Sequence, residues 1–145
     1  MGTRTPFHGS GRFYWGLLAC LALGITWVRA DRDLQLEGKN AEELNKVQAV
    51  IEKAVQADPG NSELWVHLGM VHRKADRVED AQKAFEQAAR LNPSNANAHF
   101  MLGLIFEKKG QTGKAISSWE ACRNASKEEK MRQIAEKHLK ILNDR

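Results

Sequence analysis

The sequence predicts an all-α fold in which a pair of helices recurs about every 34 residues. Residue types in 62–95 largely return 34 positions later, in 96–129. Turn-forming residues such as Asp58-Pro59-Gly60 separate the segments. Within the segments, apolar residues stand three or four positions apart, as on one face of an α-helix. We therefore expect helical hairpins stacked side by side into a solenoid. The matched positions are Trp65 and His99, Leu68 and Leu102, Gly69 and Gly103, His72 and Phe106, Ala81 and Ala115, Phe85 and Trp119, and Ala88 and Cys122.

The composition allows one domain and argues against several classes of ligand. All 18 acidic residues and 19 of the 22 basic residues lie at or after Asp31, so this part of the chain is nearly neutral. The basic pI therefore reflects the first 30 residues, and we expect no nucleic-acid partner. Cys20 and Cys122 do not suggest a disulfide, and no Cys/His cluster suggests a structural metal. We predict no cofactor and no metal site.

Residues 1–30 are predicted to form a signal anchor around an uncharged run, Phe13–Val28. As a helix the run reaches about 24 Å, short of the roughly 30 Å hydrocarbon core of a bilayer. Arg12 and Arg29 flank the run and can extend it towards the headgroups. A cleaved signal peptide ending at Ala30 and a mitochondrial presequence are the alternatives. The anchor interpretation places the helical domain outside the cytoplasm, in the periplasm if the source is bacterial; the alternatives make the protein secreted or mitochondrial.

After a polar linker, 31–39, six further helices are expected. Asn40 and Glu43 have the spacing of a capping box at the start of the first helix. This segment, 40–58, matches only the second helix of the 34-residue unit, so it is a half repeat.

The first full repeat, 62–95, is expected to contain helices Ser62–Lys74 and Arg77–Leu91. Asn61 is placed to cap the first helix, and Asp76 with Glu79 to form a capping box on the second.

The second repeat, 96–129, is predicted to copy the first with helices 96–109 and 111–125. A last helix in 127–143, opened by Ser126 and Glu129 as a capping box, is expected to cover the end of the array.

The repeated pattern resembles the tetratricopeptide repeat family over about residues 40–142, and we expect 40–143 to be a domain of this kind. The resemblance implies a non-enzymatic scaffold whose ligands lie in a concave groove lined by the first helix of each pair. Since no nucleophile–base pair or paired carboxylates stand on a recognisable site, we expect no catalytic residues.

The resemblance also implies which residues line the groove. An apolar floor with a basic rim suits an amphipathic or extended apolar peptide. The alternative is that these side chains pack on neighbouring helices or on a second protomer, which would make a homo-oligomer. The peptide-binding residues expected are Val66, Met70, Arg73, Lys74, Asn97, Phe100, Met101, Leu104 and Lys108.

The function that we predict is protein–protein binding during assembly of an envelope or membrane complex, with the membrane contacted through Phe13–Val28. A self-associating structural protein and a mitochondrial assembly factor are the alternative hypotheses.

Overall fold

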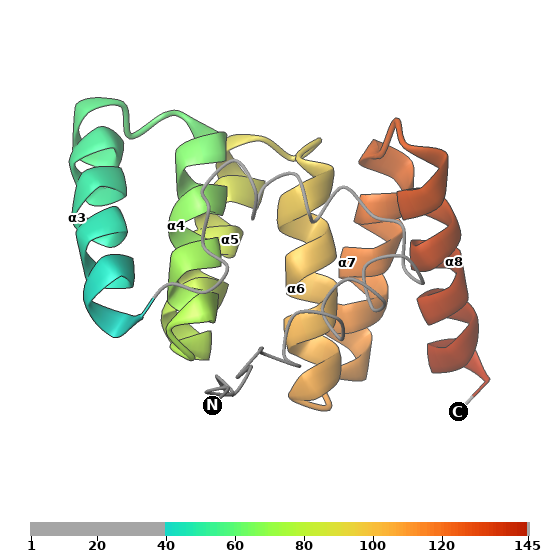
Figure 1. Ribbon diagram of the computed structural model, residues 1–145. Helices are drawn as coiled ribbons and strands as arrows, with labels where there is room; N and C mark the ends of the chain where they lie inside the picture. Colours follow the sequence, from blue (N-terminus) through green and yellow to red (C-terminus); the bar gives the residue numbers. More distant parts are fainter. Residues whose placement is uncertain (1–39, 145) are drawn as a thin grey trace, which may run out of the picture.

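The computed structural model describes residues 40–144, which form six helices and no strand (Figure 1). The prediction of an all-α fold is confirmed for this part of the chain. The helix predicted over 62–74 has its expected limits, the three helices predicted over 77–91, 96–109 and 111–125 each differ by one residue at one end, and the last helix begins two residues after the predicted start at 127. The helices are α3 (Ala41–Ala57), α4 (Ser62–Lys74), α5 (Val78–Leu91), α6 (Ala96–Lys108), α7 (Thr112–Ala125) and α8 (Glu129–Asn143).

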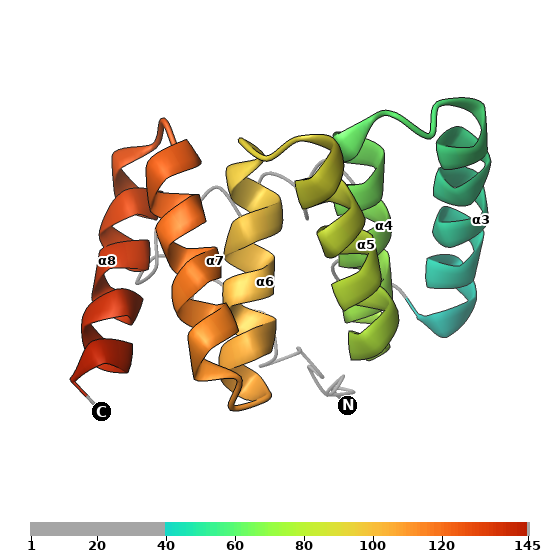
Figure 2. The same ribbon diagram turned by 180° about the vertical axis from the view of Figure 1, so that it is seen from behind.

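The helices stand side by side in a row of hairpins. Helix α4 pairs with α5 and α6 pairs with α7, while α3 packs on α4 and α8 packs on α7 at the two ends. In Figure 1, α4 and α6 lie on the near side, with α5 and α7 behind them; Figure 2 shows the opposite side. The first helices of the two hairpins therefore form one face of the array, and the second helices form the other.

Asparagine side chains begin three of the helices. The Asn40 side chain accepts a hydrogen bond from the Glu43 backbone N–H at 2.9 Å, and the Asn40 backbone N–H donates to the Glu43 carboxylate at 3.2 Å. This capping box confirms the predicted start of α3. Asn61 and Asn95 accept from the first turns of α4 and α6 in the same manner. Each side chain satisfies a backbone donor that the helix itself leaves unpaired.

The turn between α4 and α5 corrects a prediction. Asp76 does not cap α5; it adopts a left-handed conformation with φ of 58°, and Arg77 is an N-cap without a side-chain hydrogen bond. The backbone N–H groups of Asp76 and Arg77 donate to carbonyls in the last turn of α4. Gly110, 34 positions later, closes α6 with φ of 68° and the same bonds. Helices α4 and α6 therefore end in the same motif, which needs a residue with positive φ and favours glycine. At Asp76 the need for positive φ prevails over the predicted capping box on α5.

Replacing Asp76 by glycine is therefore expected to raise the free energy of unfolding by about 0.5–1 kcal/mol, because glycine adopts positive φ without the steric cost of a Cβ atom. Urea denaturation measures the change. Gly110→Ala is the matched control and is expected to lose about 1 kcal/mol at the equivalent turn. A destabilised Asp76→Gly protein would contradict this description of the turn.

The start of α8 also differs from expectation. The N-cap is Glu128, and the Ser126 hydroxyl accepts a hydrogen bond from the Glu128 backbone N–H at 3.1 Å instead of capping the third helical residue. The Glu129 carboxylate binds the side chains of Arg132 and Gln133. The predicted capping box is wrong because Ser126 closes a short local turn, which competes with the helix cap for the same hydroxyl.

In each hairpin, an aromatic ring of the second helix packs on a glycine of the first helix. A Cβ atom on Gly69 would lie 2.6 Å from the Phe85 ring, and one on Gly103 would lie 2.7 Å from the Trp119 ring. Both rings are fully buried. The interlock repeats with the 34-residue spacing, and it allows the two helices of each hairpin to approach closely.

No helix within 40–144 has the length and hydrophobicity needed to cross a membrane. The predicted anchor run Phe13–Val28, the rest of 1–30 and the linker 31–39 lie outside the described residues.

Candidate functional site

Helices α4 and α6 run in the same direction, and side-chain hydrogen bonds connect their N-terminal ends. The Asn95 side-chain amide, at the start of α6, donates to the Glu63 carboxylate at 2.8 Å and to the Ser62 hydroxyl at 3.3 Å, both at the start of α4. Residues 34 positions apart therefore occupy equivalent levels on neighbouring helices.

All nine residues predicted for the groove lie on these two helices. On α4, Val66, Met70 and Arg73 share one stripe, because residues three and four apart lie on the same side of a helix. Gly69, which faces α5, lies three residues from Val66 and four from Arg73, so this stripe borders the side of α4 that packs on its hairpin partner. We define the α4/α6 face by Val66, Met70, Arg73 and Lys74 of α4 and Asn97, Phe100, Met101, Leu104 and Lys108 of α6.

The apolar part of the α4/α6 face is largely buried. Val66 keeps 2% of its surface exposed, and Met70, Phe100 and Met101 keep 3% each. Leu104 is partly buried. Among the polar members, Asn97 and Lys108 are exposed, while Arg73 and Lys74 are intermediate. The nine residues lie on α4 and α6, and the low exposure of the apolar members agrees with the alternative that these side chains pack on neighbouring helices.

The ring of Phe100 also contacts Trp119 of α7, which belongs to the buried core. Its ring meets the Trp119 ring edge-on, with centroids 5.0 Å apart. Trp119 in turn donates from Nε1 to the Glu107 carboxylate at 2.6 Å and stacks on His138 of α8 at 4.3 Å. The same carboxylate oxygen lies 2.8 Å from His138 Nδ1. Phe100 therefore also packs α6 against α7, as the alternative interpretation of the sequence expected.

Basic residues gather where α4 and α6 end. Arg73 and Lys74 occupy the last turn of α4, and Lys108 the last turn of α6. Cations there are favoured by the partial negative charge of a helix C-terminus. Glu63 stands at the opposite end, in the first turn of α4. The α4/α6 face is thus uncharged along its middle and basic at one end.

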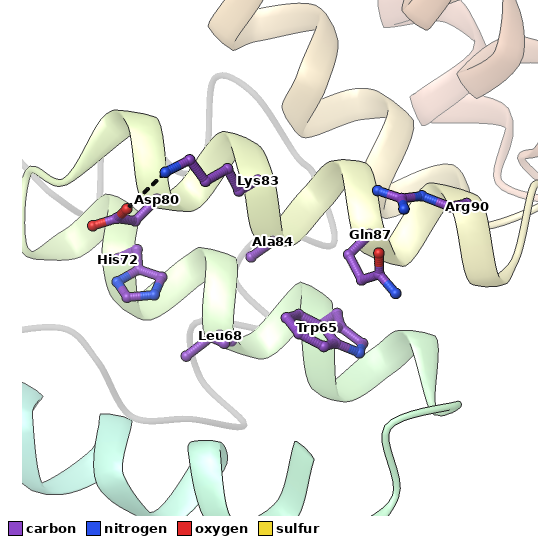
Figure 3. A pocket seen from close by; sticks show the side chains of 8 residues that line it. All are labelled: Trp65, Leu68, His72, Asp80, Lys83, Ala84, Gln87 and Arg90. Atoms are coloured by element: carbon purple, nitrogen blue, oxygen red, sulfur yellow. Dashed lines mark ion pairs between the residues drawn. The ribbon is translucent and has the colours of Figure 1, made fainter. Parts of the chain in front are cut away.

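A hollow of about 630 Å³ lies on another side of the first hairpin, between α4 and α5 (Figure 3). It has an apolar floor and a charged edge, where Lys83 pairs with Asp80 at 3.8 Å. The sequence analysis did not find this hollow, because the polar residues of α5 have the pattern of an ordinary solvated helix face. The lining residues are Trp65, Leu68, His72, Asp80, Lys83, Ala84, Gln87 and Arg90.

His72 is the most buried polar group of this hollow. Its side chain is 9% exposed, and Nδ1 has no hydrogen-bond partner among the described residues. Burial, with a smaller contribution from the nearby Arg77 charge, lowers the pKa of His72 below its usual 6.5. The imidazole is therefore neutral at pH 7, and it packs at a position where the second repeat has Phe106.

The described residues include neither a metal-binding cluster nor an accessible thiol. Within 40–144, no group of three or more His, Cys, Asp or Glu residues is placed to hold a metal ion. Cys122 is fully buried, and burial raises the pKa of its thiol to about 12, so it is not a nucleophile at neutral pH.

Comparison with known proteins connects the helical pattern to one family. Residues 68–128, from the middle of α4 to the start of α8, match the family model of the tetratricopeptide repeat. A search of the curated proteins found no match.

Proposed function

We propose that the chain is a tetratricopeptide repeat protein whose α4/α6 face binds a segment of another protein, because residues 68–128 match the model of this family and such repeats generally mediate contacts between proteins. The function is that of a scaffold that holds its partner without chemical change.

The register of α4 and α6 is the observation that carries this proposal. The Asn95 bridge aligns the helices, so that Val66 lies level with Phe100, Met70 with Leu104, and Lys74 with Lys108. Two parallel apolar rows that end in cations suit an amphipathic helix or an extended apolar strand of polypeptide. An acidic group of the partner is best placed at the basic end.

We further propose that the scaffold works at a membrane, during assembly of an envelope complex. The support is the uncharged run Phe13–Val28, flanked by Arg12 and Arg29. In this proposal the run tethers the domain on the side of the membrane away from the cytoplasm, which is the periplasm in a bacterium.

Leu104→Asp in the full-length chain tests the binding face. Leu104 is only partly buried, so the domain is expected to fold, as circular dichroism would check. A carboxylate within the apolar rows carries a desolvation cost in any complex, and recovery of protein partners in a membrane pull-down should fall strongly.

Val50→Asp is the matched control, because Val50 is 68% exposed on α3 and lies outside the α4/α6 face. It should recover the same partners as the parent chain. Retention of every partner by Leu104→Asp would remove the α4/α6 face from consideration as the binding site.

A further inference from the structure

One end of the hollow between α4 and α5 combines an aromatic ring with two polar side chains (Figure 3). Trp65 of α4 lies there beside Gln87 and Arg90 of α5, while Leu68 and Ala84 form the floor further along the hollow. Trp65 and Gln87 are partly buried and Arg90 is exposed, so a ligand in the hollow can reach all three. Tryptophan and arginine are the residue types enriched where proteins bind their partners most strongly.

Packing within the repeat does not explain these three side chains. The residues that pack α4 on α5 recur 34 positions later, as Gly69 does in Gly103. The end of the hollow does not recur in this way. In the second hairpin, the positions equivalent to Trp65, Gln87 and Arg90 hold His99, Ala121 and Asn124.

The edge of the hollow carries one unbalanced positive charge. Lys83 Nζ lies 3.8 Å from the Asp80 carboxylate, so these two charges offset each other. Within residues 40–144, the side chains of Arg90 and Gln87 make no hydrogen bond or ion pair, whereas Gln82 of the same helix bonds to other side chains. A guanidinium and an amide with free N–H groups suit a carboxylate.

We propose that this end of the hollow is a second peptide-binding site, which takes an extended segment of a partner protein with an apolar side chain two residues from an Asp or Glu. The apolar side chain lies against the Trp65 ring, and Arg90 and Gln87 bind the carboxylate. The site shares no residue with the α4/α6 face, so the inference goes beyond the proposed function and its failure would leave that proposal standing.

The dimensions of the hollow fit such a segment. Ala84 and Arg90 are six residues apart on α5, which is about 9 Å along the helix axis. Alternate side chains of an extended chain lie on the same side, about 7 Å apart, and the long arginine side chain covers the difference. The volume of about 630 Å³ lies within the range of ligand pockets, about 300–1,000 Å³, and admits a few extended residues.

An NMR titration of the isotope-labelled full-length chain tests the proposal with two synthetic peptides blocked at both ends. The first is Ser-Gly-Leu-Ser-Glu-Gly-Ser, and the second has Lys in place of Glu. We expect the Glu peptide to bind with a Kd of about 1 mM and the Lys peptide more weakly. Binding should shift the indole N–H signal of Trp65 and the amide signals of Gln87 and Arg90. The indole signal of Trp119, which is fully buried, should not move.

Arg90→Glu reverses the charge at an exposed position, so the domain is expected to fold. It should bind the Glu peptide about five- to tenfold more weakly and the Lys peptide more tightly than the parent chain does. Lys140→Glu, exposed on α8, is the matched control and should keep the parent's preference. The proposal would be overturned by an unmoved Trp65 signal, by shifts confined to the α4/α6 face, or by an Arg90→Glu chain that still prefers the Glu peptide.

Discussion

Replacing Trp119 by alanine is expected to remove about 3–5 kcal/mol from the free energy of unfolding. Trp119 is the largest fully buried side chain of the described residues. Its ring covers Gly103, meets Phe100 edge-on and stacks on His138, so its loss opens a cavity where α6, α7 and α8 join. The change also removes the donor at 2.6 Å from the Glu107 carboxylate. Small domains are stable by only about 5–15 kcal/mol, so the loss should be evident in urea denaturation.

Trp65→Ala provides the matched comparison. Trp65 is only partly buried, and its Nε1 donates to the exposed Pro59 carbonyl at 3.0 Å. We expect a clearly smaller loss of stability there. If Trp119→Ala unfolded with the same free energy as the parent or as Trp65→Ala, the packing described at the α6–α8 junction would be wrong. Trp119→Phe, which keeps an aromatic ring, should fall between the two.

Gly69→Ala is expected to destabilise the domain, although alanine is the better helix former. The new Cβ atom would lie 2.6–2.9 Å from three atoms of the buried Phe85 ring. Overpacking of this kind costs about 1–3 kcal/mol, which outweighs the gain of up to about 1 kcal/mol in helix propensity. Thermal and urea denaturation measure the net loss.

Gly113→Ala is the control with the opposite expected sign. Gly113 lies in the first turn of α7, and a Cβ atom there would meet no other atom within 4 Å. Its stability should therefore rise by up to about 1 kcal/mol. Combining Gly69→Ala with Phe85→Leu should recover part of the clash energy, which a double-mutant cycle would show. Equal effects at Gly69 and Gly113 would contradict the close approach of α4 and α5.

The arrangement of the helices could be predicted because it depends on short-range patterns. The 34-residue recurrence of Gly69 as Gly103 and of Phe85 as Trp119 reflects one packing contact made twice. Asn40 was recognised as a cap because its partner lies three residues away.

The failed caps show where such local patterns compete. Asp76 and Glu79 have capping-box spacing, yet the end of the preceding helix needs a left-handed residue at Asp76. Its equivalence to Gly110 was available in the sequence and would have identified the turn. Ser126 has a similar pattern, but its hydroxyl is used within a local turn to Glu128.

The candidate site could be predicted only in part. Helical periodicity places Val66 and Met70 on one stripe of α4, but it does not show which segment covers that stripe. Contacts between distant residues were equally hidden. The hydrogen bond between His138 and Glu107, 31 residues earlier, follows only from the way α8 packs on the second hairpin.

Photo-cross-linking from position 104 in the full-length chain, in its native cell, tests the α4/α6 face most directly. A photoreactive residue replaces Leu104 in one variant and Val50 in another, and mass spectrometry identifies the cross-linked peptides. We predict that position 104 yields adducts with an apolar segment of a partner protein and that position 50 does not. No adduct from position 104, or the same adducts from both positions, would show that the α4/α6 face is not where this protein holds another segment.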